Sequence, residues 1–244
     1  MANLTSKYNT YEKILHESTS VNRTLNPFSK TIETLTSGQL IKFVLQYCIF
    51  PKNIISILHT ATYNLSYNNF TAATNELIQN INEELGVYTD ETCLIIPKPH
   101  YTVLRTGIME GLGIDINYQQ ADNSTEQFIS KLKSLVDASN IHKVCGSVYA
   151  IEYSAILELE IVLSLVKQLF KLEEKEPPSF LVEFFQYHVD DIEVGHKDRF
   201  YNYCSEHLKK QQHHDDFEMG FREVMQSMDT WWLTMYSDIV ETHA

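Results

Sequence analysis

Val148-Tyr149-Ala150-Ile151-Glu152-Tyr153-Ser154-Ala155-Ile156-Leu157 is the middle of a long apolar segment that runs from about 141 to 172. Apolar side chains occupy most sides of a helix built from this segment, so we expect the helix to lie at the centre of the fold. A carboxylate is costly to bury there unless it is hydrogen-bonded, protonated or bound to a metal ion. Glu152 therefore indicates either a hydrogen bond to a buried tyrosine or a metal site.

Helical spacing of apolar residues dominates the rest of the chain, and strand-like alternation is nearly absent. Pro51 follows one apolar run directly and predicts a kink or the first turn of a new helix, whereas Pro97 and Pro99 exclude a helix across 87–99. Gly86 is a candidate C-cap. We predict one all-α domain over residues 1–244 with seven or eight helices, at about 40–50, 70–85, 100–112, 124–136, 141–172, 179–207 and 217–242.

Composition excludes several classes of protein. The formal net charge of −13 and the absence of a basic stripe argue against nucleic-acid binding. The four cysteines show no CxxC spacing, which argues against a structural zinc site or a disulfide framework. Neither a signal peptide nor an uninterrupted apolar run of membrane-spanning length is evident, so we expect a cytoplasmic protein without a membrane segment.

The densest group of metal-ligand side chains lies between His188 and His196, which are eight residues apart and bracket Asp190, Asp191 and Glu193. On a regular helix Asp190 points away from the histidines, while Asp191 and Glu193 each lie about 60° from one of them. A π-bulge would rotate Glu193 onto the histidine face, and we favour it over Asp191. Imidazole and carboxylate together suit iron or manganese. The alternative is an ordinary polar helix surface.

Further candidate ligands are Glu83 and Glu84 at the end of one predicted helix and His100 at the start of the next. Adjacent glutamates near a helix end are commonly solvated, and a single histidine is commonly incidental. Carboxylates and histidines from several helices of one bundle are nevertheless the usual ligands of a carboxylate-bridged di-iron site. Taken with Glu152 and the histidine pair, these residues favour a dinuclear metal site.

Three stretches resemble the heme-oxygenase-like di-iron oxidases, and most closely their CADD group, proteins that associate with death domains. The first stretch comprises residues 82–86, His100 and the helix that ends at 111–113. The second is 148–152 and the third is 188–196. In addition, residues 26–28 and 38–47 resemble the N-terminal part of that family. The resemblance implies a seven-helix heme-oxygenase-like bundle, a homodimer, and an oxidase or oxygenase that uses two iron ions, or iron and manganese, with dioxygen to oxidise a small organic substrate. The implied ligands are Glu83, His100, Glu152, His188, His196 and Glu193, with Asp191 as the alternative to Glu193.

The chain departs from this family at three points. Glu83 and His100 are 17 residues apart, much farther than in the family, and the His188–His196 spacing is one residue longer. Members that make para-aminobenzoate consume one of their own tyrosines and use a lysine, but Ser29 and Val162 occupy the matching positions. We therefore do not expect that self-sacrificing reaction.

Two other functions stay open. Cys145, Tyr149 and Glu152 share one helix face, and TenA-type thiaminases of similar fold use a cysteine nucleophile beside a glutamate without a metal. A CADD-like protein-interaction module is the second alternative. Tyr47, Tyr149 and Tyr187 are candidates for a substrate-pocket wall, although core packing is the more usual role for such aromatic residues.

Overall fold

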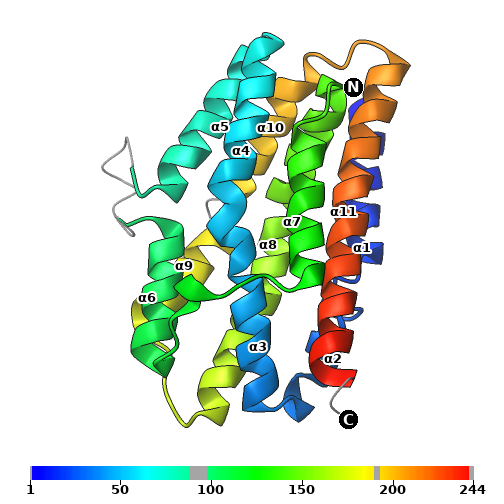
Figure 1. Ribbon diagram of the computed structural model, residues 1–244. Coiled ribbons are helices and arrows are strands. Elements are labelled where there is room, and N and C mark those ends of the chain that lie inside the picture. The colour runs from blue at the N-terminus through cyan, green and yellow to red at the C-terminus, as the bar shows by residue number, and fades with distance from the viewer. Residues whose placement is uncertain (1, 88–97, 190–192, 242–244) are drawn as a thin grey trace.

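Helix α8 (Ile141–Leu172) is the centre of the fold. It contacts α2, α3, α4, α7, α9, α10 and α11, and Val148, Tyr149 and Ala150 in its middle are completely buried. The prediction of a central helix across 141–172 is thus confirmed. Figure 1 shows the other long helices lying alongside α8.

The structure is a computed structural model that describes residues 2–87, 98–189 and 193–241, without the side chains of 2–9, 193 and 194. Short 3-10 turns occur at Ile32–Thr34 and Ile116–Tyr118. The other α-helices are α1 (Ala2–Glu17), α2 (Pro27–Thr31), α3 (Ser37–Tyr47), α4 (Ile49–Tyr67), α5 (Thr71–Glu84), α6 (His100–Leu112), α7 (Asn123–Val136), α9 (Ser179–Tyr187), α10 (Glu193–Ser205) and α11 (Gln211–Val240).

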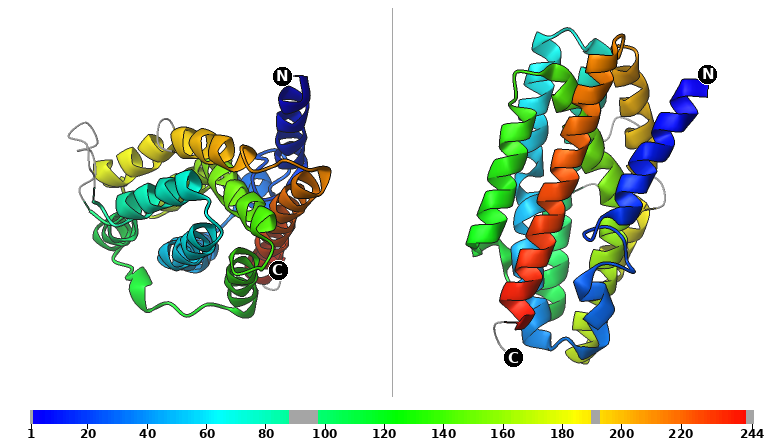
Figure 2. Two further views of the ribbon diagram at one scale, coloured as in Figure 1. Left: turned by 90° about the horizontal axis from the view of Figure 1, so that it is seen from above. Right: turned by 90° about the vertical axis from the view of Figure 1, so that its right-hand side faces the viewer.

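The all-α prediction is confirmed, and no strand occurs in the described ranges. The structure contains more helices than the seven or eight that we predicted, and the differences have identifiable causes. Helices α1 and α2 were not predicted, Pro51 lies in the first turn of a separate helix α4, and the helix predicted across 179–207 is divided into α9 and α10. Figure 2 shows that most helices run along one long axis, with α1 on the outside against α11.

Local sequence signals explain several helix ends. Thr36 and Gln39 form a reciprocal capping box at the start of α3. Asp122 and Asn140 accept backbone N–H groups at the starts of α7 and α8. Gly113, with φ of 76°, ends α6 in the left-handed conformation that glycine adopts without steric cost.

Two glycines allow α8 and α11 to approach closely. A Cβ atom on Gly146 would lie 1.8 Å from the carbonyl oxygen of Phe217, and one on Gly220 would lie 2.1 Å from that of Lys143. Any larger residue would force the two backbones apart. The close approach buries Phe217, Phe221 and other aromatic side chains of α11 in the core.

One segment meets the length and composition of a membrane span. Ser37–Tyr67 comprises α3 and α4, but 56% of its most apolar stretch is buried inside the bundle. Core helices commonly pass the same test, so this segment is weak evidence for a membrane span.

Candidate metal centre

Seven titratable side chains from five parts of the fold meet between α5, α6, α8, the end of α9 and α10. We call them the His–Glu cluster. Most are nearly inaccessible, with His100 4%, His188 3%, His196 3%, Glu152 3% and Glu76 5% exposed. The members are Glu76, Glu83, Glu84, His100, Glu152, His188 and His196.

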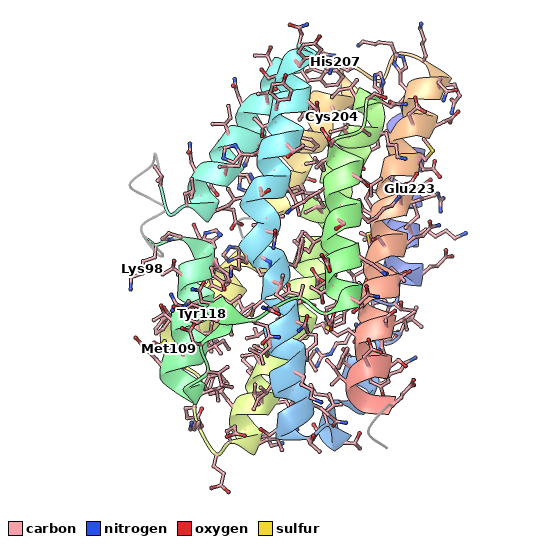
Figure 3. All side chains as sticks on the ribbon, viewed as in Figure 1. Lys98, Met109, Tyr118, Cys204, His207 and Glu223 are labelled. Carbon is pink, nitrogen blue, oxygen red and sulfur yellow. The ribbon has the colours of Figure 1, made fainter. Side chains whose placement is uncertain are left out.

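The end of α5 places Glu84 beside His100. The N–H groups of Gly86 and Val87 bind the carbonyl oxygens of Glu83 and Asn82, the two hydrogen bonds of a Schellman motif, and Gly86 has φ of 74°. A Cβ atom on Gly86 would lie 2.5 Å from the carbonyl carbon of Lys98, so only glycine permits this contact. Figure 3 shows Lys98 at the start of α6. The chain thus returns to the end of α5, and the 17-residue separation of Glu83 and His100 does not separate them in space.

His188 presents its Nε2 lone pair to the cluster. Its Nδ1 lies 2.6 Å from the carbonyl oxygen of Phe184, which can only accept, so Nδ1 carries the proton. Burial, reinforced by nearby His100, lowers the pKa of His188 to about 4, so the ring is neutral at pH 7. Nε2 is 3.1 Å from Nδ1 of His100, which is also 3.2 Å from Oε1 of Glu84. Two acceptor atoms therefore face one proton on His100.

His196 forms a second centre with two glutamates. Its Nδ1 lies 2.8 Å from Oε1 of Glu76, and its Nε2 lies 2.9 Å from Oε2 of Glu83. Burial alone would lower the pKa of His196, but the hydrogen bonds to Glu76 and Glu83 raise it to about 10, so the ring is an imidazolium that donates from both nitrogens. Arg199 also donates to Glu76, at 2.9 Å from Nε, and fixes that carboxylate.

Glu152 lies next to both centres. Its Oε2 accepts a hydrogen bond of 2.9 Å from Nδ2 of Asn80 on α5. Burial raises the pKa of Glu152 to about 7; the positive charge of His196 opposes this rise, and the charges of Glu84 and Glu76 add to it. The predicted burial of Glu152 is confirmed, with an asparagine rather than a tyrosine as its hydrogen-bond partner.

Asp191 and Glu193 are the two carboxylates predicted between the histidine pair. Asp191 lies outside the described residues, and the side chain of Glu193 is not described. The described backbone is π-helical at His188 and Val189, and α10 begins at Glu193. This irregular geometry agrees with the bulge that the eight-residue spacing predicts.

Five of the predicted ligands, Glu83, His100, Glu152, His188 and His196, belong to the cluster. Sequence reasoning did not single out Glu76, did not assign Glu84 as a ligand, and missed Asn80. Their spacing offered a signal, because residues 76, 80 and 83–84 repeat at one and two helical turns along α5. This polar spacing was overlooked because the apolar residues of α5 give the stronger periodic pattern.

In their present positions, however, no three His, Cys, Asp or Glu side chains across 2–87, 98–189 and 193–241 converge to hold a metal ion. The ligand atoms instead face one another in pairs through shared protons, on His100 Nδ1 and on both nitrogens of His196. The donor types and their number fit two first-row metal ions. Binding would require loss of the protons on His100 Nδ1 and His196 Nε2, together with side-chain rotations that bring the ligand atoms to a common point.

A cavity of about 90 Å³ opens beside the cluster. Its walls are mostly apolar and come from α3, α4, α5, α6, α8 and α9; the apolar part includes Tyr47, Leu104, Ile151 and Phe184. Cluster members Glu84, His100, Glu152 and His188 line the cavity directly. Of the three tyrosines predicted as wall candidates, Tyr47 lines it, whereas Tyr149 and Tyr187 do not.

Cys145 does not line this cavity. It is completely buried and lies against Cys204, whose pKa is raised far above its ordinary value by burial and by the contact with Cys145. Figure 3 shows Cys204 much nearer the top of the bundle than Lys98 at the start of α6. This position offers no support for a cysteine nucleophile acting with Glu152.

Comparison with other proteins identifies the family. Over residues 2–238 the chain matches the model of a domain of unknown function with solved structure, DUF3865, and so belongs to that family. Two crystal structures of a CADD-like protein of unknown function from Nostoc punctiforme PCC 73102 share 25% sequence identity with it. One has a TM-score of 0.83 and covers 96% of this chain and 99% of that chain; the other has 0.82 and covers 98% of each. No curated protein matches the chain. The CADD-like relationship is therefore confirmed.

Proposed function

We propose that this member of DUF3865 is a heme-oxygenase-like oxidase or oxygenase that binds two metal ions, iron with iron or iron with manganese, in the His–Glu cluster. The substrate is a small organic molecule held in the adjoining cavity, and dioxygen is the oxidant. When bound, the metal pair would supply the reduction of dioxygen and the oxidation of the substrate. The side chains described above would hold the metal ions, hold the substrate and exclude water.

The observation that supports this proposal most strongly is the second hydrogen-bond partner of His188 and of His196. In a metal-binding histidine, the N–H of the other ring nitrogen commonly donates a hydrogen bond to a carbonyl or carboxylate oxygen, which fixes the orientation of the ring and of its metal-binding nitrogen. His188 donates Nδ1–H to Phe184, and His196 donates Nδ1–H to Glu76. Both Nε2 atoms are thereby directed toward the cluster.

The carboxylates fit the same arrangement. Glu84 lies beside His100 and His188, Glu83 lies beside His196, and Glu152 is adjacent to both groups. Glu152 would therefore help to hold the metal pair from the α8 side, and the amide of Asn80 holds its Oε2 in place. Glu76 and Arg199 would act as positioning residues for His196.

The cavity supports an enzyme more than an interaction module. A surface that binds a protein partner has no use for three buried histidines beside a mostly apolar cavity. The apolar walls would exclude bulk water from the cluster and hold the carbon chain of a substrate against it. A homodimer in the cytoplasm stays a prediction.

Anaerobic metal loading tests the proposal. Purified protein incubated with ferrous iron and desalted should retain close to two metal ions per chain, measured by elemental mass spectrometry. His188→Ala and Glu152→Ala should each lose most of this metal. His59→Ala and Glu160→Ala, which change exposed residues of α4 and α8, serve as matched controls and should retain it. Wild-type protein that stays metal-free after this treatment would refute the proposal.

A further inference from the structure

A second buried carboxyl group lines the cavity away from the His–Glu cluster. Glu158 of α8 is only 1% exposed and is one of the cavity-lining residues. It lies six residues beyond Glu152, which corresponds to about 9 Å along the helix axis. Ala155, on the same stripe of α8, lines the cavity between them. Glu158 therefore stands at a distance from the proposed metal site, within the same cavity.

Glu158 has an incomplete set of hydrogen bonds. Its Oε1 accepts a bond of 2.8 Å from Nε1 of Trp232, and within the described part of the chain Trp232 is its sole partner. Burial raises the pKa of Glu158 to about 7, with the Trp232 hydrogen bond opposing the rise. Burying an ionised carboxyl group is energetically costly unless its oxygens are well hydrogen-bonded, and Trp232 contacts only one oxygen of Glu158.

The charge of the cavity favours a cationic partner. Three glutamates line it, namely Glu84, Glu152 and Glu158, together with two histidines and mostly apolar side chains. Its described lining contains neither lysine nor arginine. A carboxylate ligand would meet like charge, whereas an ammonium group would neutralise Glu158 and donate a hydrogen bond to the oxygen that Trp232 does not contact.

We propose that Glu158 binds the primary amino group of a short apolar amine, whose carbon chain extends along the cavity toward Glu152. The cavity of about 90 Å³ limits this chain to a few carbon atoms without rearrangement of its walls. That such an amine is oxidised rests on the proposed function, but its binding to Glu158 does not require a metal ion.

The two tryptophans provide a direct test. Trp232 donates its indole N–H to Glu158, whereas Trp231 donates its own to Thr125 at 3.0 Å, outside the cavity lining. In metal-free protein labelled with ¹⁵N at tryptophan, n-butylamine at pH 8 should shift the Trp232 indole signal and leave the Trp231 signal in place. 1-Butanol and butyrate have about the size of n-butylamine but lack its positive charge, so they should bind at least about tenfold more weakly.

Glu158→Gln keeps an oxygen acceptor for Trp232 but removes the negative charge, so it should weaken n-butylamine binding at least about tenfold. Glu160→Gln removes the same charge from the exposed side of α8 and should leave binding unchanged. Equal binding of the three ligands, no shift with any of them, or full n-butylamine binding by the Glu158→Gln variant would overturn the inference. Iron loading of the same samples reports separately on the metal site, so failure of one proposal is distinguishable from failure of the other.

Discussion

Replacing Glu158 with glutamine should make the protein less sensitive to alkaline pH. The native carboxyl group has a pKa of about 7, against an ordinary value of 4.5 that we take for the unfolded chain. Between these values the native state holds a proton that the unfolded state has released, so stability falls as pH rises through this window. At about 1.4 kcal/mol per pH unit, Glu158 alone should cost the wild-type protein about 2 to 3 kcal/mol between pH 5 and pH 8.

Urea unfolding of metal-free protein at pH 5, 6, 7 and 8 measures this effect. The free energy of unfolding of Glu158→Gln minus that of wild type should rise by about 2 to 3 kcal/mol across the series. Taking the difference removes the contributions of Glu152 and the histidines, which titrate in both proteins. Glu160→Gln should give a difference that is flat with pH, because its side chain is exposed. A flat difference for Glu158→Gln would refute the assignment of a buried, protonated carboxyl group at this position.

Gly146→Ala should lower the free energy of unfolding by at least about 2 kcal/mol in urea titrations, because the new Cβ would collide with the Phe217 carbonyl oxygen; Gly38→Ala, which has open space around it, should not. Ferrous iron affinity should fall about tenfold for each pH unit below 8 if His196 must release one proton, and a pH-independent affinity in anaerobic titrations would contradict this. Gly86→Ala should reduce iron retention, since it forces Lys98 and His100 away from α5. Cys145→Ser should leave iron retention intact, and loss of metal in this variant would place the thiol at the site.

The helical architecture was largely predictable because its signals are local. Apolar periodicity gave the bounds of α6, α7 and α8 to within one or two residues, and Pro51 and Gly86 act as their positions in the sequence indicate. The N-terminal helix α1 was missed because its apolar spacing is weak. The division between α9 and α10 was expected only as an irregularity, since one residue of excess spacing does not specify how the backbone absorbs it.

The candidate site was predictable only in part. A buried glutamate such as Glu152 stands out from its apolar neighbours, and closely spaced histidines stand out as a pair. Glu76 gives no such signal, because its role depends on His196 and Arg199, which lie more than 100 residues away in the sequence. The roles of Asn80 and Glu158 likewise depend on tertiary contacts. Asn80 binds Glu152, and Glu158 binds Trp232 and lines the cavity.

The sequence by itself therefore determined that this protein is a helical bundle with an acidic, histidine-containing interior, because periodicity and the cost of burying charge act at each residue. Only the tertiary structure decided which carboxylates meet which histidines, since the close contact of Lys98 with Gly86 places the start of α6 against the end of α5 and Glu84 beside His100. It also decided that Glu158 faces a cavity instead of solvent. Such pairings depend on how helices pack across the whole chain, and no local pattern encodes them.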